Sequence, residues 1–303
     1  MNKTRTTTTP VAPRGSRARA GFRQADASGG RLRVLSYNIQ AGVAGARYRH
    51  YLTRGWRHLA PYPGRWRTLA AIARRLADFD LVGLQETDAG SFRTGFNSPT
   101  AFLARGAGFS FWFDQINRRV AGLARHSNGL LSRAEPFELH EYPLPGPPGR
   151  GALLALYGVP ARPLAVLVLH LALGRRTRGR QLRYLAPHIG HYQDLIMMGD
   201  FNCNPQSREL ADLLAETTLR APTIAGGTYP SWAPWRRLDH ILVTPSIRVE
   251  RCYLPDWRFS DHLPIAMELV VPSKLSPSAA GVHPFHHTSQ DTISCRSSSK
   301  GTR

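Results

Sequence analysis

The chain has 303 residues, of which 42% are hydrophobic and 20% charged. This apolar content suits one large domain or two small ones and excludes a chain that is disordered throughout. Forty Lys and Arg residues against 20 Asp and Glu give a formal net charge of +20, so a polyanionic partner, either nucleic acid or an anionic membrane surface, is expected. The arginine bias also fits a GC-rich genome, so the charge alone does not choose between these partners.

Targeting signals and cysteines are the features of the sequence that indicate the cellular compartment of the protein. No apolar run reaches the roughly 18 residues of a membrane-spanning helix, and the first thirty residues lack the apolar block of a secretory signal. Cys203, Cys252 and Cys295 are sparse, odd in number and without CxxC spacing, which argues against a disulfide framework or a zinc ribbon. We therefore expect a soluble, cytoplasmic protein in a reducing compartment.

The composition divides the chain into three parts. Residues 1–30 are basic, have no periodic apolar pattern and end in two glycines, which indicates a disordered arm. Residues 31–271 have no internal repeat and no linker-like break, so we expect one catalytic domain there. Residues 272–303 are Ser-rich, which predicts a disordered tail.

Within the predicted domain, short apolar runs of strand length alternate with helical patterns. The predicted strands are 33–39, 80–85, 152–159, 164–171, 194–199, 240–243 and 265–271. Apolar residues at helical spacing predict helices over 66–76 and 182–189. Because only a few residues separate the runs at 152–159 and 164–171, they read as an antiparallel hairpin, and the sheets are expected to be mixed.

Polar side chains stand at the ends of these predicted strands. Four runs end in or just before Asn38, Glu86, His170, and Asp200 with Asn202, and two others begin after Asp239 and after Asp261 with His262. Each residue alone also fits a turn or a helix cap. Because the start of a strand lies beside the end of its antiparallel partner, the whole set can meet at one edge, where its oxygen atoms suit Mg²⁺ or Mn²⁺ rather than structural zinc.

The motifs around these residues resemble those of the endonuclease/exonuclease/phosphatase superfamily, which includes deoxyribonuclease, abasic-site endonucleases and bacterial sphingomyelinases. The motifs are LSYNIQ, LVGLQET, LVLHLAL, MMGDFNCNP, RRLDHILV and FSDHLP, in this order. The resemblance implies an α+β fold with four α/β/β/α layers, in which helices flank two mixed β-sheets and the site lies in a cleft at the top of the sandwich. It also implies hydrolysis of a phosphoester by in-line attack of water, without a covalent enzyme intermediate.

The resemblance also implies the position of the metal ion. Glu86 would coordinate Mg²⁺ or Mn²⁺, with Asn38 and Asp261 on the same side. Abasic-site endonucleases have an acidic residue where this chain has Gln40 and a tyrosine where it has His170. These departures indicate the branch that contains deoxyribonuclease and the sphingomyelinases.

Five residues are expected to act on the phosphate. By the same resemblance, Asp200 and Asn202 would hold the attacking water and the phosphate. His262, paired with Asp239, would be the general base or a phosphate-stabilising group, because a neighbouring carboxylate raises the basicity of an imidazole and fixes its tautomer. His170 would add a hydrogen bond to the phosphate.

Three segments are candidates for substrate recognition. Residues 46–65 interleave Arg with Tyr and Trp, which suits nucleic acid, a membrane interface or an ordinary surface loop. Residues 228–240 bring two tryptophans close to Asp239 in the chain, and residues 117–133 supply arginines. The residues predicted to contact substrate are Arg118, Arg125, Asn128 and Trp232.

Three functions fit these observations. The leading one is a metal-dependent phosphodiesterase that cleaves nucleic acid, with salt-sensitive binding. The alternative is a hydrolase of phospholipid headgroups or small phosphoesters at a membrane surface. The third is a catalytically idle binding protein, which the intact motifs disfavour. No obligate protein partner is evident from the sequence.

Overall fold

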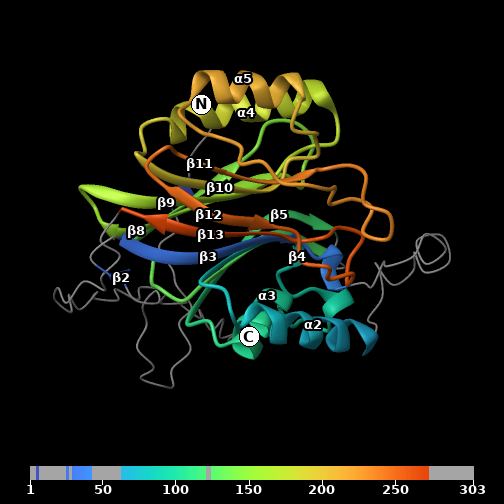
Figure 1. Cartoon of the computed structure of the whole chain (residues 1–303). Coiled ribbons are helices and arrows are strands. Elements are labelled where there is room, and N and C mark those ends of the chain that lie inside the picture. The colour runs from blue at the N-terminus through green and yellow to red at the C-terminus, as the bar shows by residue number, and fades with distance from the viewer. Residues whose placement is uncertain (1–4, 7–24, 27–28, 43–62, 121–123, 273–303) are drawn as a thin grey trace, which may run out of the picture.

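The computed structural model describes residues 5–6, 25–26, 29–42, 63–120 and 124–272. In this part of the chain two β-sheets pack face to face, and helices cover the outer face of each sheet (Figure 1). The four-layer sandwich expected from the sequence is thus confirmed. None of the described helices is long and apolar enough to cross a bilayer.

The first sheet has seven strands among the described residues. In spatial order they are β12 (Arg248–Tyr253), β13 (Ile265–Val271), β3 (Gly29–Asn38), β4 (Leu81–Asp88), β6 (Ala124–Ser132) and β5 (Phe111–Val120), with β2 (Ala25–Asp26) paired to β3. The β3–β4 pair is parallel and the other pairs are antiparallel. Helices α2 (Pro63–Leu76) and α3 (Pro99–Ala107) cover its outer face.

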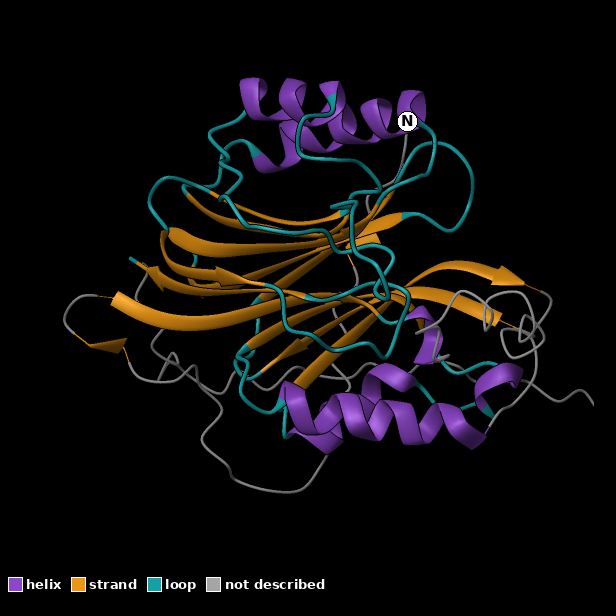
Figure 2. Ribbon diagram, turned by 45° about the vertical axis from the view of Figure 1, so that its right-hand side comes forward, coloured by secondary structure: helices purple, strands orange, loops and turns teal. Residues whose placement is uncertain are grey.

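The second sheet has six strands among the described residues. They are β1 (Arg5–Thr6), β7 (Glu138–Pro143), β8 (Gly151–Val159), β9 (Arg162–His170), β10 (Asp194–Asp200) and β11 (Asp239–Val243), in that order. Here β9 and β10 are parallel, and the other neighbours are antiparallel. Helices α4 (Arg175–Ile189) and α5 (Arg208–Glu216) cover the outer face, which Figure 2 shows from a second direction.

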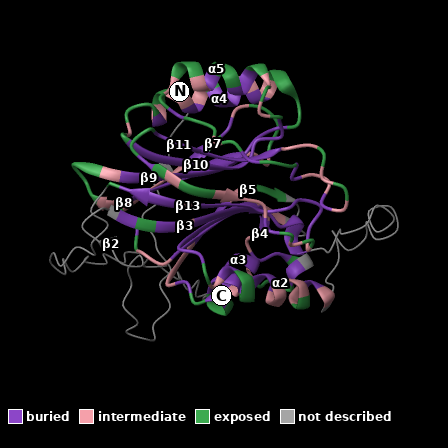
Figure 3. Ribbon diagram, viewed as in Figure 1, coloured by how far each residue is buried: buried purple, intermediate pink, exposed green. Residues whose placement is uncertain are grey.

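Apolar side chains fill all three interfaces between the four layers. Val34, Val166 and Met198 belong to the cluster between the sheets, while Leu69 and Leu185 belong to the clusters under α2 and α4. Figure 3 shows the result, with buried strands at the centre and helices exposed on their outer sides. This burial supplies the main driving force for the fold.

The sheets approach closely at Gly83 on β4. A Cβ atom at this position would lie 3.0 Å from a methyl carbon of Val168 on β9. A larger residue there would push the parallel strand pairs of the two sheets apart. The glycine thus helps to hold together the two strand pairs that carry the polar ends described below.

The predicted strands are all present, with ends shifted by a few residues. The predicted helices match α2 and α4 in position, and the hairpin at 152–159 and 164–171 is the antiparallel β8–β9 pair. Several elements were not predicted, among them β5, β7, β12, α3 and α5. The strand β12 shows the reason, since it is a largely solvent-accessible edge strand with the polar sequence RVERCY and no apolar run.

The predicted arm and tail are described only in part. Within residues 1–30 the structure describes β1, which pairs with β7, β2, which pairs with β3, and the first two residues of β3. The rest of that arm lies outside the described residues. Residues 273–303 of the predicted tail also lie outside them.

Candidate active site

The carboxyl ends of the two parallel strand pairs meet at one edge of the sandwich. Asn38 ends β3, and β4 carries Glu86 close to its own end, while β9 ends in His170 and β10 in Asp200. In the sheet register Asp200 lies beside His170 on one side and opposite Asp239 of β11 on the other. The strands thus bring most of the predicted site residues to one place.

Asp200 is the centre of the hydrogen-bond network at this edge. It is 1% exposed, and its Oδ2 accepts a hydrogen bond from Asn38 Nδ2 at 3.1 Å. Its Oδ1 accepts from the backbone N–H of Asn202 at 2.9 Å. His170 Nε2 lies 3.4 Å from Asp200 Oδ2. This carboxylate therefore contacts residues from both sheets.

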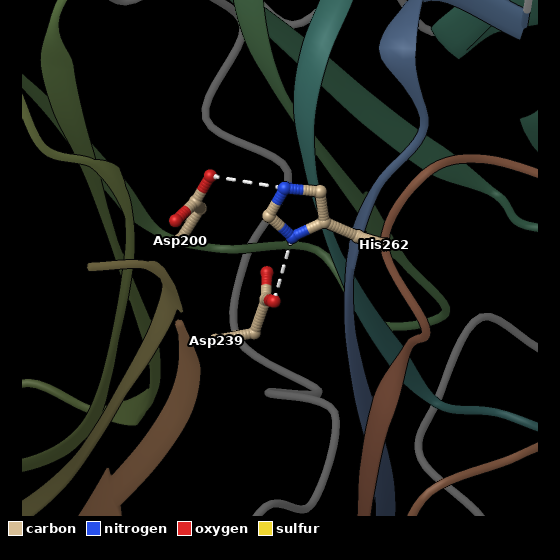
Figure 4. Close-up of side chains that lie close together, drawn as sticks. All are labelled: Asp200, Asp239 and His262. Carbon is tan, nitrogen blue, oxygen red and sulfur yellow. Dashed lines mark hydrogen bonds and ion pairs between the residues drawn. The ribbon is translucent and has the colours of Figure 1, made fainter. Parts of the chain in front are cut away.

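His262 and Asp239 form the predicted pair. The distance from His262 Nδ1 to Asp239 Oδ2 is 2.8 Å, and His262 Nε2 lies 3.9 Å from Asp200 Oδ2 (Figure 4). The ring of Tyr229 packs against the imidazole with a centroid distance of 5.0 Å. These contacts fix the ring and leave Nε2 on the side of Asp200.

The charges of this cluster shift two pKa values upward. Burial raises the pKa of Asp200 to about 7, and the neighbouring Asp239 adds to this rise, against the opposing charge of His262. Burial alone would lower the pKa of His262, but the carboxylates of Asp239 and Asp200 outweigh it and raise the pKa to about 10. These shifts favour the cationic form of His262 and make Asp200 a stronger base than an ordinary aspartate.

His170 differs from His262 in its charge state. Burial lowers the pKa of His170 well below the usual value for histidine, and the nearby cation of Arg150 lowers it further. Arg150 Nη1 lies 3.3 Å from His170 Nδ1. Since a guanidinium only donates, Nδ1 is the acceptor and Nε2 carries the proton that faces Asp200. Arg150, His170 and Asp200 thus form one chain of contacts.

Left-handed backbone re-aims the residues at the strand ends. Glu86 has φ +53° and lies where the β4–β6 register shifts, which marks a β-bulge. Gln40 has φ +46° and Asn202 has φ +53°. Non-glycine residues seldom adopt this conformation, and such strain concentrates at functional sites.

Gln40 links the ends of β3 and β13. Its Nε2 donates to Asp261 Oδ2 at 3.2 Å, and its backbone N–H donates to Asn38 Oδ1 at 3.2 Å. The carbonyl oxygen of Asp261 accepts from the backbone N–H of Ser231 at 2.7 Å. Asn38, Gln40 and Asp261 therefore form one connected group. Burial raises the pKa of Asp261, and the negative charge of Glu86 raises it further.

The donor atoms of the site suit a hard divalent cation. Buried Oε1 of Gln40 and Oδ1 of Asp239 have no hydrogen-bond partner among the described residues. Asp200, Asp239 and His262 offer ligand atoms that lie within 4.8 Å of one another, so this group can hold a metal ion. Carboxylate and amide oxygens are the ligands that Mg²⁺ and Mn²⁺ prefer.

The residues predicted to contact substrate lie in different settings. Arg118 lines a pocket beside Glu86. Asn128 is 1% exposed, and its Nδ2 donates to Gly151 O at 2.9 Å, so it links β6 of one sheet to β8 of the other. A contact of Asn128 with substrate stays a prediction.

The other two predicted contact residues lie in loops or at hairpin ends. Arg125 lies opposite Arg119 in the strand register, near the end of the β5–β6 hairpin. Trp232 is half-buried and follows Ser231, which bonds to Asp261. Most of the 46–65 segment lies outside the described residues.

Sequence reasoning missed three residues that contact the site. The sequence marks Gln40 only as a departure from abasic-site endonucleases, whereas in the structure its side chain donates to Asp261. Tyr229 lies in a segment already singled out for its tryptophans. Arg150 reaches His170 because the next residue, Gly151, lies opposite His170 in the β8–β9 register. The predicted hairpin specifies no register and therefore does not predict this contact.

Comparisons with known proteins identify a family for this chain. The model of the endonuclease/exonuclease/phosphatase family matches residues 35–262. No curated protein sequence matches the chain significantly.

Solved structures share the fold at low sequence identity. An endonuclease/exonuclease/phosphatase protein from Beutenbergia cavernae is 22% identical with a TM-score of 0.64, over 80% of this chain and 72% of that one. The catalytic domain of human nocturnin, solved with a sulfate anion, is 18% identical with a TM-score of 0.60, over 79% and 94%. A mannosyl-6-phosphatase from Bacteroides thetaiotaomicron is 19% identical with a TM-score of 0.58, over 79% and 99%.

Proposed function

Because the chain belongs to the endonuclease/exonuclease/phosphatase family, we propose that it is a divalent-metal-dependent phosphodiesterase that cleaves nucleic acid by in-line attack of water. The observation that carries this proposal is the contact between Asp200, whose pKa is raised to about 7, and a cationic His262 held by Asp239. Such a pair places a base, Asp200, within 3.9 Å of a cationic hydrogen-bond donor, His262 Nε2. Gln40 and His170 further support the branch of deoxyribonuclease and the sphingomyelinases.

Asp200 is the proposed base. A carboxylate that titrates near neutral pH both exists in its basic form and accepts a proton readily, which is the optimum for general base catalysis. The backbone N–H of Asn202 and the amide of Asn38 orient its two oxygens, so one of them can accept the proton of the attacking water. The Asn202 side chain donates to Leu171 O at 2.9 Å, which leaves its amide oxygen to hold the water.

His262 and His170 are proposed to contact the phosphate. Cationic His262 would donate from Nε2 to a phosphoryl oxygen, while Asp239 holds its Nδ1. Neutral His170 would donate from Nε2, which lies between Asp200 Oδ2 at 3.4 Å and Glu86 Oε1 at 3.9 Å. Both histidines thus offer hydrogen-bond donors on the side of Asp200.

Glu86, Asp261 and Asn38 are proposed to hold the Mg²⁺ or Mn²⁺ ion. When bound, the ion would stabilise negative charge on the phosphoryl oxygens and on the leaving group. The accessible carboxylate of Glu86 and the charge of Asp261 near it support this location. The other possible metal site is the group of Asp200, Asp239 and His262. There the cationic imidazole of His262 already neutralises part of the charge of the two carboxylates and would compete with a metal ion.

Nucleic acid is the proposed substrate because the chain carries a net charge of +20 and because Arg118 lies beside Glu86. A phospholipid headgroup at a membrane surface is the alternative, and Trp235 favours it. Its side chain is 76% exposed and its ring lies 5.6 Å from the guanidinium of Arg236, a combination also found at membrane interfaces.

A hydrolysis assay on a panel of substrates tests the proposal. The purified chain would be incubated in Mg²⁺ and in EDTA with plasmid DNA, single-stranded RNA, mixed phospholipid vesicles, bis-(p-nitrophenyl) phosphate and a sugar 6-phosphate. The sugar phosphate is included because one structural neighbour is named a mannosyl-6-phosphatase. We expect cleavage of nucleic acid that EDTA abolishes. Turnover of phospholipid or sugar phosphate with intact DNA and RNA would overturn the proposed substrate, and equal activity in EDTA would overturn metal dependence.

A further inference from the structure

A basic pocket of about 400 Å³ opens beside Glu86. Its lining includes Glu86, Arg118, His126, Gly149, Arg150 and Thr177. Asp200, Asp239 and His262 do not line it. The pocket is therefore adjacent to the proposed reaction centre and separate from it.

The charges in this pocket favour an anion. Its lining carries two arginines and a histidine against a single carboxylate, Glu86. Neither Arg118 nor Arg150 is paired with a carboxylate in the described part of the chain. Guanidinium groups without an ion-pair partner are well suited to bind phosphate, because their planar fork of donors matches its oxygen atoms.

The wall of the pocket is held in place by local contacts. Gly146 has φ +114°, and a Cβ atom there would lie 2.6 Å from Thr177 Cγ2, so the loop before β8 fits tightly against α4. Gln181 Nε2 donates to Pro145 O at 3.0 Å and anchors the same loop. A site with a fixed wall loses less conformational entropy when a ligand binds.

Arg150 connects this pocket to the reaction centre. Its guanidinium lines the pocket and also donates to His170 Nδ1 at 3.3 Å, and His170 Nε2 lies 3.4 Å from Asp200 Oδ2. An anion bound to Arg150 would therefore lie one histidine away from the proposed base. This arrangement fits a ligand that spans both places.

We propose that this pocket binds a second phosphate group of the substrate, next to the phosphate that is hydrolysed. The inference rests on the proposed phosphodiesterase function and narrows it to phosphodiesters that carry another phosphate nearby. The chemistry is the same for the neighbouring phosphate of a polynucleotide and for the terminal phosphate of a small molecule.

Matched dinucleotides test this inference. The substrates are TpT, which has one phosphate, pTpT and TpTp, which have a second phosphate at either end, and thymidine 3′,5′-bisphosphate as the small-molecule source. Binding is measured by titration calorimetry in EDTA, where hydrolysis does not consume the ligand, and turnover is measured in Mg²⁺. We expect one of the two-phosphate dinucleotides to bind about tenfold more tightly than TpT, as one charge-assisted hydrogen bond can supply.

Neighbouring arginines on β5 provide the variant and its control. Arg118→Gln should abolish the preference for the second phosphate, whereas Arg119→Gln should retain it, because Arg119 is also exposed but does not line the pocket. Equal affinity of the parent for TpT and both two-phosphate dinucleotides would overturn the inference. An equal loss in both variants would also overturn it, because general electrostatic attraction would then account for the preference.

The two readouts separate this inference from the proposed function. Preferential binding in EDTA without turnover of any dinucleotide in Mg²⁺ would support the subsite and contradict the phosphodiesterase. Turnover of TpT and pTpT at equal kcat/KM, with equal affinity, would support the phosphodiesterase and overturn the subsite. Tighter binding of thymidine 3′,5′-bisphosphate than of any dinucleotide would support the pocket and assign it to small molecules.

Discussion

The two parallel strand pairs of the sandwich share one topology and carry different chemistry. Each pair is flanked by an outer helix that lies between its strands in the chain, α2 for β3 and β4, and α4 for β9 and β10. The first pair presents Glu86, whose side chain is 38% exposed, and the second presents Asp200, whose side chain is 2% exposed. An exposed carboxylate is open to a cation from solvent, whereas a buried one holds a proton at higher pH. Burial, rather than residue type, therefore distinguishes the two carboxylates.

The largest expected effect comes from the buried member of this comparison. Asp200→Asn should lower kcat on the preferred substrate by about 10³-fold, because asparagine cannot accept the proton of the attacking water. Steady-state hydrolysis of the preferred substrate in saturating Mg²⁺ measures the loss, with thermal unfolding as the control for folding. Residual activity above a tenth of the parent would contradict the role of Asp200 as the base.

The comparison also shows how far the sequence leads. The convergence of Asn38, Glu86, His170 and Asp200 follows from their positions at strand ends, because parallel strands of a sheet end at the same edge. The chain of contacts through Arg150 does not follow, since it depends on the β8–β9 register and on the conformation of a Pro/Gly loop.

Side-chain direction sets a further limit on prediction. The place of Asn128 in an Arg-rich segment predicts a contact with substrate, which stays a prediction, whereas the hydrogen bond from its amide nitrogen to Gly151 O within the sandwich could not be predicted. A shift of one residue in register exchanges the two faces of a strand, so a loosely patterned segment does not reveal which side chains face the site. The same ambiguity hid β5, whose sequence FWFDQINRRV mixes apolar and charged residues.

A second prediction concerns Asp114, a carboxylate on β5. Asp114 Oδ1 accepts from Thr100 Oγ1 at 2.5 Å, and its Oδ2 accepts from Ser98 Oγ at 2.8 Å. Burial raises the pKa of Asp114 from 3.8 to about 6, although these hydrogen bonds oppose the rise. The sheet of the first strand pair thus also contains a carboxylate that holds a proton, but it lies on β5, next to Thr87 of β4, and outside the cluster around Asp200.

This shift gives a definite sign to the pH dependence. Between pH 4 and 6 the folded protein retains a proton on Asp114 that the unfolded chain has lost, so this group lowers the free energy of unfolding as the pH rises. The decrease is at most roughly 3 kcal/mol, which is the free-energy equivalent of this pKa shift. Because the side chain is partly exposed, screening by water makes the decrease smaller. Asp114→Asn should flatten the pH dependence of stability in this window, as measured by urea unfolding.

An exposed carboxylate provides the matched control for this experiment. Asp256, whose side chain is 72% exposed, lies 2.7 Å from Arg258 Nε at the surface, so Asp256→Asn removes the same charge without a buried group. Parallel pH curves for the parent and Asp114→Asn would show that Asp114 does not hold its proton in the folded state. A change confined to Asp114→Asn would assign the slope to burial.

The smallest expected effect decides which carboxylates bind the ion. If the ion lies on the side of the exposed carboxylate, Glu86→Gln should weaken Mn²⁺ binding at least tenfold, as loss of a charged ligand does, while Asp239→Asn should change it less than twofold. Titration with Mn²⁺, followed by electron paramagnetic resonance in the absence of substrate, measures both affinities. The opposite ranking would move the ion into the group of Asp200, Asp239 and His262, whose ligand atoms lie within 4.8 Å of one another. His262 would then have to lose its proton to bind the ion, so Mn²⁺ affinity would rise steeply with pH, a dependence that the Glu86 location does not require.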